Sequence, residues 1–191
     1  MPRREITMRS IVNNCVFGCL AFAAASASFA NDVQLAISEE LIDVRFVAEY
    51  EQGFSGALAY MHSGYHNTDT DALSYTFATQ GKVDLIDVLL GARLFWLDSE
   101  DEHVYGVALG GGVKANIIDK LSASGEAYYA PDVTTGGDSE NILDLSTQLN
   151  YQLIENGTVF VGYRFYEIDT DNRFRNDEIY DDPYIGVKFS F

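Results

Sequence analysis

Residues 142–153, ILDLSTQLNYQL, alternate between two kinds of side chain at every position. One face carries Leu143, Leu145, Thr147, Leu149, Tyr151 and Leu153, and the other carries Asp144, Ser146, Gln148, Asn150 and Gln152. An amphipathic helix would need apolar residues spaced by three and four, whereas a period of two is that of a strand between two environments. This segment therefore predicts a β-strand with one apolar and one polar face.

The same period recurs along the chain and predicts ten strands with no helix of useful length. The first predicted strand is the shortest. The segments are about as long as a membrane-crossing strand, which needs roughly 9–11 residues. The predicted strands lie near residues 32–38, 41–50, 53–62, 72–80, 87–97, 104–115, 121–130, 142–153, 158–168 and 180–191.

Two architectures bury one face of such strands. A soluble sandwich or lipocalin-like barrel turns the apolar face inward, whereas an outer-membrane barrel turns it toward lipid. Three features favour the membrane barrel. The polar face is rich in Gly, Ala and Ser, the connections alternate between short and long, and aromatic residues gather near the strand ends. Those aromatic residues are Tyr50, Tyr60, Trp96, Tyr105, Tyr129, Tyr151 and Phe191.

The connections show the asymmetry most clearly. Residues 155–157, ENG, form a tight turn, while 62–71, 131–141 and 169–178 are long and polar. Short turns on one rim and long loops on the other are typical of outer-membrane barrels. The sequence thus predicts an all-β, up-and-down antiparallel transmembrane β-barrel of eight to ten strands, with ten preferred.

The first 30 residues have the pattern of a secretory signal peptide: Arg3, Arg4 and Arg9, then an apolar stretch, then Ser28-Phe29-Ala30. We expect cleavage after Ala30, which leaves residues 31–191 as one barrel domain exported through the periplasm to the bacterial outer membrane. Both cysteines, Cys15 and Cys19, would leave with the signal, so no disulfide is expected. Of 12 basic and 29 acidic residues, the mature chain would keep nine and 28. A net charge of −19 argues against nucleic acid as a partner.

The chain ends in YIGVKFSF, residues 184–191, with no polar tail. In a closed barrel the last strand pairs with the first, because lipid cannot satisfy an open sheet edge. A terminal aromatic after an alternating strand also resembles the signal that outer-membrane assembly machinery reads in barrels generally. We expect Tyr184, Val187, Phe189 and Phe191 to carry that signal.

Three segments resemble the YfaZ family of outer-membrane proteins: GEAYYAPD (125–132), GYRFYEID (162–169) and DDPYIGVKFSF (181–191). The resemblance covers most of the mature chain, and its distinctive residues lie in the last third. Asp182 departs from it, because Gly is expected before Pro183. The resemblance implies a small outer-membrane barrel of Gram-negative bacteria and carries over no catalytic or ligand residue.

The inward charges are the candidate functional residues. A buried charge must be paired or solvated, so these side chains either form a salt-bridged plug or line a narrow polar pore that selects solutes. The sequence thus predicts a narrow porin-like channel for small solutes or, alternatively, a non-conducting structural or adhesive barrel. In the predicted register the lumen-facing charges are Arg45, Arg93, Lys114, Arg164, Lys188, Asp43, Glu49, Glu126 and Asp144.

The acidic loops are the second candidate surface. Asp69 and Asp71, residues 98–102 and residues 169–182 hold many carboxylates. They would bind divalent cations weakly and bridge the protein to lipopolysaccharide phosphates, although no segment has the spacing of a dedicated Ca²⁺ loop. The sequence therefore predicts lipid and lipopolysaccharide as partners, beside the assembly machinery, and predicts no cofactor.

An enzyme is not expected. The histidines are His62, His66 and His103, and only His103, beside Asp101 and Glu102, has the neighbours of a general base. There is no G-x-S-x-G motif and no metal-ligand spacing. We therefore predict no catalytic and no metal-binding residues.

Overall fold

The computed structural model describes residues 31–191 except 51–52, 66–68, 100–102, 138 and 171–175. The predicted signal peptide, with its cleavage site and both cysteines, lies outside the described residues and stays a prediction. In the described part of the chain, no helix is long and apolar enough to cross a membrane.

The described chain is built from β-strands and one short 3₁₀ helix, η2 (Asp132–Thr134). Strand β8 is a two-residue segment, and the other ten strands form the barrel. The strands are β1 (Asp32–Ile37), β2 (Leu41–Tyr50), β3 (Phe54–Ser63), β4 (Thr70–Val83), β5 (Ile86–Ser99), β6 (His103–Ile118), β7 (Leu121–Ala130), β8 (Thr135–Gly136), β9 (Ser139–Ile154), β10 (Gly157–Thr170) and β11 (Asn176–Ser190).

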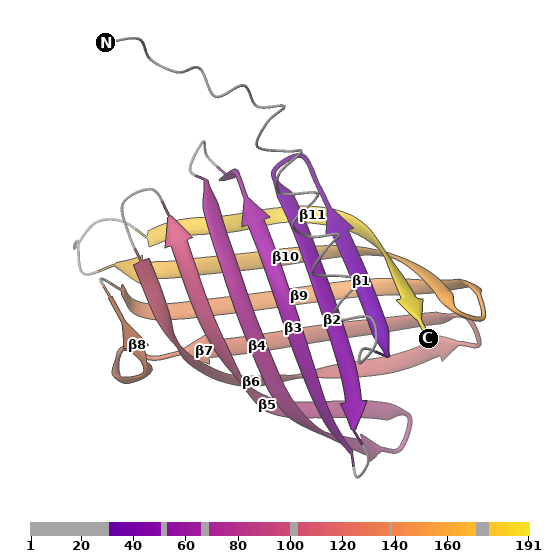
Figure 1. The fold of residues 1–191 in the computed structure, drawn as a ribbon. Helices are drawn as coiled ribbons and strands as arrows, with labels where there is room; N and C mark the ends of the chain where they lie inside the picture. Colours follow the sequence, from indigo (N-terminus) through magenta and orange to yellow (C-terminus); the bar gives the residue numbers. More distant parts are fainter. Residues whose placement is uncertain (1–30, 51–52, 66–68, 100–102, 138, 171–175) are drawn as a thin grey trace.

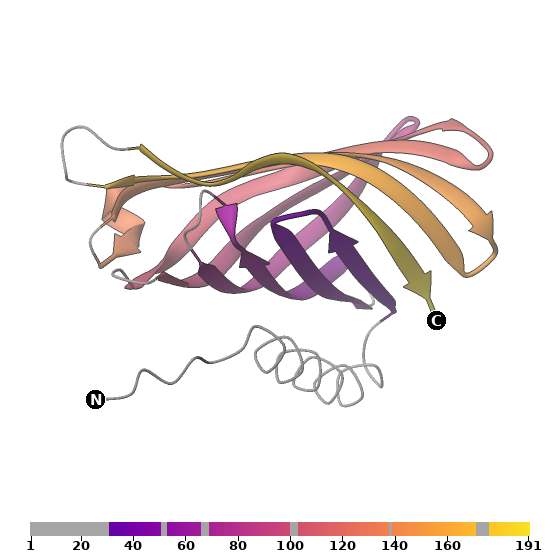
Figure 2. The same cartoon turned by 90° about the horizontal axis from the view of Figure 1, so that it is seen from above.

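The ten long strands close into one antiparallel barrel. Each pairs with its neighbour in the chain, β7 pairs with β9, and β1 pairs with β11 to close the ring. In Figure 1 the wall from β1 to β5 (indigo to magenta) crosses the wall from β9 to β11 (orange to yellow), and Figure 2 shows the two walls facing each other. The prediction of a closed ten-stranded up-and-down barrel is confirmed.

The alternating residues divide as predicted between a lipid-facing wall and the lumen. Large apolar side chains such as Leu90 (62% exposed), Trp96 (59%) and Ile185 (59%) lie on the outer surface of the barrel. Their alternate neighbours, including Phe95 and Tyr184, are buried inside. A wall that exposes aliphatic and aromatic residues in this way matches hydrocarbon rather than water.

The two rims differ. One rim, here called the terminal rim, has residues 31 and 191 and the short links 84–85, 119–120 and 155–156. There the Phe191 amide donates to the Asn31 carbonyl at 2.8 Å. The opposite rim, the loop rim, has the carboxyl ends of β3, β7 and β10 and the starts of β4, β9 and β11, and the chain between β7 and β9 includes η2 and β8. Several strands extend further toward the loop rim than predicted: β9 begins at Ser139 and β11 at Asn176. Strand pairing there continues through polar residues that the sequence pattern indicates as loop.

Backbone pairing in the described wall is interrupted between β3 and β11. Strand β1 pairs with β11 only from Asp32↔Ser190 to Ile37↔Ile185, so it ends part of the way up the barrel. Among the described strands none pairs with residues 178–184 on the side away from β10. This segment of β11 holds Pro183, which has no amide hydrogen and therefore suits a strand edge.

Side chains close this seam. The Ser63 hydroxyl donates to the carbonyl of Ile179 at 2.7 Å, and the Tyr180 hydroxyl donates to Ser38 Oγ at 2.9 Å. Ile179 is the residue that the β10–β11 ladder skips, so Ser63 satisfies a bulge carbonyl. The ring of Tyr65 packs edge-on against Tyr180, with ring centroids 5.9 Å apart.

Candidate functional site

The lumen is filled differently at its two ends. Toward the loop rim it is packed with apolar and aromatic side chains from every part of the barrel, here called the apolar layer. Tyr128, 2% exposed, and Tyr180, 0% exposed, are its largest fully buried members. The layer comprises Leu41, Met61, Phe95, Leu97, Val104, Tyr128, Ile142, Tyr166, Ile168, Ile179 and Tyr180.

Below the apolar layer lies a continuous ionic network of three arginines and three carboxylates. Arg164 on β10 contacts Asp144 on β9 at 2.9 Å and Asp43 on β2 at 3.0 Å. Arg93 on β5 contacts the same Asp144 and also Glu126 on β7, the latter at 3.1 Å.

Arg45 on β2 completes the network by contacting Glu126 at 3.1 Å. Members of the network come from both walls of the barrel, so it spans the lumen.

The network is balanced in charge and rich in additional contacts. Arg93 Nε donates to Thr76 Oγ1 at 3.0 Å, and its guanidinium lies 3.8 Å from the ring centroid of Tyr128. The Arg164 guanidinium lies 5.1 Å from the ring centroid of Tyr166. Equal numbers of positive and negative groups, with further donors used, are what a buried ionic cluster needs to offset desolvation.

The apolar layer and the network leave little free space. A void of about 20 Å³ remains between them, beside Asp144, Arg164 and Phe95. A second void of about 20 Å³ lies beside Asp43 and Tyr184. Each has room for about one water molecule. In the described structure, the lumen is therefore closed above the network.

Toward the terminal rim the lumen opens into a polar cavity of about 490 Å³, here called the vestibule. Its inner end is formed by Arg45, Arg93 and Glu126. Amides and hydroxyls line its walls, including Gln34, Ser55, Gln80, Ser124, Gln148 and Asn150. The vestibule is thus a polar pocket that opens at one rim and ends at the network.

The nine charges that the sequence places in the lumen divide into two groups. Asp43, Arg45, Arg93, Glu126, Asp144 and Arg164 form the network. Lys114, Lys188 and Glu49 instead line the vestibule, where Lys188 Nζ lies 4.0 Å from Asp32. The sequence pattern does not separate these groups. Asp32, Lys82 and Asp87, which also line the vestibule, were not predicted from the sequence, although the alternation of β1 places Asp32 on the inner face.

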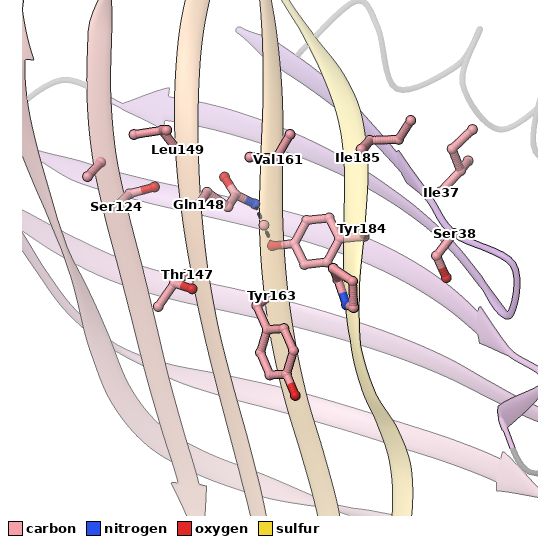
Figure 3. Close-up of a pocket in the computed structure, with 13 residues that line it drawn as sticks. Ile37, Ser38, Ser124, Thr147, Gln148, Leu149, Val161, Tyr163, Tyr184 and Ile185 are labelled. Atoms are coloured by element: carbon pink, nitrogen blue, oxygen red, sulfur yellow. Dashed lines mark hydrogen bonds between the residues drawn. The ribbon is translucent and has the colours of Figure 1, made fainter.

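A hollow on the outer wall, about 780 Å³, lies over β7, β9, β10 and β11 beside the end of β1 (Figure 3). Leu149, Val161 and Ile185 line it, and all three belong to the lipid-facing set. Between them and the lumen, Gln148 Nε2 donates to the Tyr184 hydroxyl at 3.0 Å (Figure 3). The hollow faces hydrocarbon, so it is part of the lipid contact rather than a solvent-filled site.

The described histidines lie outside the lumen. His62 Nδ1 is 2.9 Å from Asp71 Oδ1, and His103 Nδ1 is 2.7 Å from Asp98 Oδ1. His103 therefore contacts Asp98, while Asp101 and Glu102, its expected neighbours, and His66 lie outside the described residues. Across the described ranges, no three His, Cys, Asp or Glu side chains are grouped closely enough to hold a metal ion.

Comparison with known proteins identifies the barrel. The family model described as YfaZ precursor matches residues 8–191, nearly the whole chain. The chain belongs to the YfaZ family. A curated relative, "Outer membrane protein YfaZ" of Escherichia coli (strain K12), is 29% identical over 87 residues, which cover 46% of this chain and 48% of the relative. The match thus spans about half the length of that YfaZ protein.

Two solved porins are among the structures that this chain matches at low sequence identity. The KdgM porin and the NanC porin each match 84% of this chain and 98% of their own chains. Each has 11% sequence identity and a TM-score of 0.45. The family match and the closed barrel described above identify this YfaZ-family chain as an outer-membrane β-barrel.

Proposed function

We propose that this YfaZ-family barrel is closed to solutes in its resting state and acts as a non-conducting outer-membrane protein. The observation that carries the proposal is the convergence of Arg93 and Arg164, from β5 and β10, on Asp144 beneath the apolar layer. A solute would have to break this buried network and displace Phe95, Tyr166 and their neighbours. Removing one partner of a buried ion pair costs about 3–5 kcal/mol, because the other charge is left buried without compensation.

A narrow porin-like channel is the second candidate, and the vestibule is the observation that favours it. A polar cavity of about 490 Å³ leads from the terminal rim to the network, as the entrance of a pore would. Conduction would then require the network and the apolar layer to move together. Outer-membrane barrels have short turns on the periplasmic side, which supports a periplasmic position for the terminal rim.

Single-channel recording separates the two functions. The protein is extracted from outer membranes, inserted into planar bilayers and compared with a variant that carries Phe95→Ala, Arg164→Ala and Tyr166→Ala. Heat-modifiable migration on a gel verifies that each barrel is closed. We expect no discrete steps from the native protein and steps from the opened variant. Discrete steps from the native protein, altered by Arg93→Gln, would replace the proposal with the channel.

The acidic loop rim is the surface proposed for partners. Asp69, Asp71 and Asp98 are described there, and no cation among the described residues pairs with them apart from the two histidines. We propose that divalent cations bridge this rim to lipopolysaccharide phosphates. Co-purified lipopolysaccharide should fall after EDTA treatment, and an unchanged amount would remove the cation bridge. No catalytic function is proposed.

A further inference from the structure

Positive charge is concentrated in one place in this acidic protein. The chain has a net charge of −17, and seven Lys and Arg residues lie in the described ranges. Five of the seven line the vestibule: Arg45, Lys82, Arg93, Lys114 and Lys188. Four carboxylates line it as well, those of Asp32, Glu49, Asp87 and Glu126. Most of the described basic side chains therefore gather in the vestibule, in a protein whose overall charge is strongly negative.

The lysines of the vestibule are only partly neutralised. Lys188 lies at the limit of an ion pair with Asp32, at 4.0 Å, and the positive charge of Lys114 also acts on it. No carboxylate among the described residues forms an ion pair with Lys114. By contrast, the arginines at the inner end are held by Glu126 and Asp144 at contact distance. Lys82 lies 3.9 Å from Asp87, and Glu49 also acts on Lys188. Lys114 on β6 is therefore the ammonium group of the described cavity without an ion pair, and Lys188 on β11 is weakly paired.

The rest of the lining suits a small hydrophilic molecule. A volume of about 490 Å³ is within the range of about 300–1,000 Å³ typical of ligand pockets. Side-chain amides and hydroxyls supply donors and acceptors without further charge, and Asn150 Nδ2 already donates to Ser124 Oγ at 3.2 Å. Gly112 and Gly125, which carry no side chain, also line the wall. The cavity combines these polar groups with apolar side chains such as Val47, Val88 and Leu89, and it ends at a charged inner surface.

We infer that the vestibule is a binding site for a small hydrophilic anion, one that carries carboxylate or phosphate groups and enters from the terminal rim. Lys114 and Lys188 contact its charged group, and the amides of Gln34, Gln80 and Asn150 contact its uncharged part. A low-dielectric wall strengthens the attraction of the two ammonium groups for an anion. The inference rests on the vestibule alone and holds whether or not the barrel conducts.

Isothermal titration calorimetry on the protein in detergent tests the site. The probes are citrate and inorganic phosphate, added at constant ionic strength against a chloride background. The test variant is Lys114→Gln/Lys188→Gln, and the matched control is Lys120→Gln in the β6–β7 turn, outside the vestibule. We expect at least one probe to bind the native protein and the control equally, and the test variant at least tenfold more weakly.

Nuclear magnetic resonance locates the binding. The sequence contains four lysines, so reductive ¹³C-methylation, which keeps their charge, gives few signals to assign. The bound anion should shift the signals of Lys114 and Lys188 and leave Lys120 unchanged. Absence of binding by both probes, or equal affinity of the test variant, would overturn the site. Conductance recordings on the same samples are a separate measurement, so a failed anion site and a failed closed barrel give different results.

Discussion

Arg164 and Asp144 form a two-point ion pair in the middle of the barrel. Arg164 Nε donates to Asp144 Oδ1 and Nη2 donates to Oδ2, both at 2.9 Å. Arg93 reaches the same carboxylate from β5, and Arg164 Nη1 continues to Asp43 on β2 at 3.0 Å. The Asp144 carboxylate on β9 thus binds Arg93 on β5, a residue 51 positions away in the sequence. Asp144 therefore holds the two halves of the ionic network together.

Replacement of Asp144 by Asn should therefore destabilise the barrel strongly. The change keeps the shape of the side chain but leaves two buried guanidinium groups without their shared counter-charge, at a cost of about 3–5 kcal/mol. Urea unfolding in lipid vesicles measures the free energy of unfolding. Asp119→Asn, in the exposed β6–β7 turn, is the control and should change stability by about 0.5 kcal/mol or less. Equal stabilities of the two variants would show that the network contributes nothing.

Gly110 makes room for Tyr128, whose ring packs against the Arg93 guanidinium. A Cβ at this position would meet the Ala127 carbonyl oxygen and would lie 2.7 Å from Tyr128 Cα and 2.8 Å from its ring. Gly110→Ala should push Tyr128 out of place and destabilise the barrel by about 1–3 kcal/mol, as overpacking does. Gly81→Ala, where nothing lies within 4 Å of the new Cβ, is the matched control. A destabilisation equal to that of Gly81→Ala would mean that Tyr128 relaxes freely.

The sequence predicts the barrel because the alternation within each strand is enough to indicate which side chains face lipid and which face the lumen. Alternation in residues 142–153 fixes which side of β9 meets lipid, and the same argument fixes the inward position of Asp144. Which charges meet is not local: Asp144 and Arg93 lie on strands that are not neighbours, and their contact depends on the stagger of the whole barrel. The period of two therefore identifies the nine lumen charges as a set but cannot divide them between the network and the vestibule.

The seam between β3 and β11 shows the same limit. The sequence predicts a short first strand, yet nothing in residues 32–38 indicates that its pairing with β11 stops at Ile185. Pro183 was the available signal, because a proline inside a strand favours an edge. The prediction that the first and last strands pair is confirmed, and the pairing runs from Asp32↔Ser190 to Ile37↔Ile185, nearer the terminal rim.

Ser63→Ala tests the seam. Ser63 is fully buried, and its hydroxyl is the donor to the Ile179 carbonyl at the bulge. An acceptor left without a partner costs about 1–3 kcal/mol. The loss should appear locally because none of the described strands pairs with residues 178–184 on this side of β11. Hydrogen exchange should become faster at the amides of residues 178–182. Ser122→Ala, on the half-buried inner face of β7, should leave those amides unchanged. Unchanged exchange in Ser63→Ala would assign closure of the seam to Tyr65 and Tyr180.

A substitution at Phe191 separates an effect on assembly in the membrane from an effect on the stability of the folded barrel. Its side chain is 75% exposed toward lipid, while its backbone amide is held by Asn31, so the ring adds little to the folded barrel. If the terminal aromatic is read during assembly, Phe191→Ala should lower the amount of folded protein in outer membranes several-fold. The free energy of unfolding after refolding in vitro should change by about 1 kcal/mol or less. Leu90→Ala, at a side chain 62% exposed on the same lipid-facing surface, is the control for lost lipid contact. Equal membrane levels of the two variants would show that the terminal ring serves only as lipid contact.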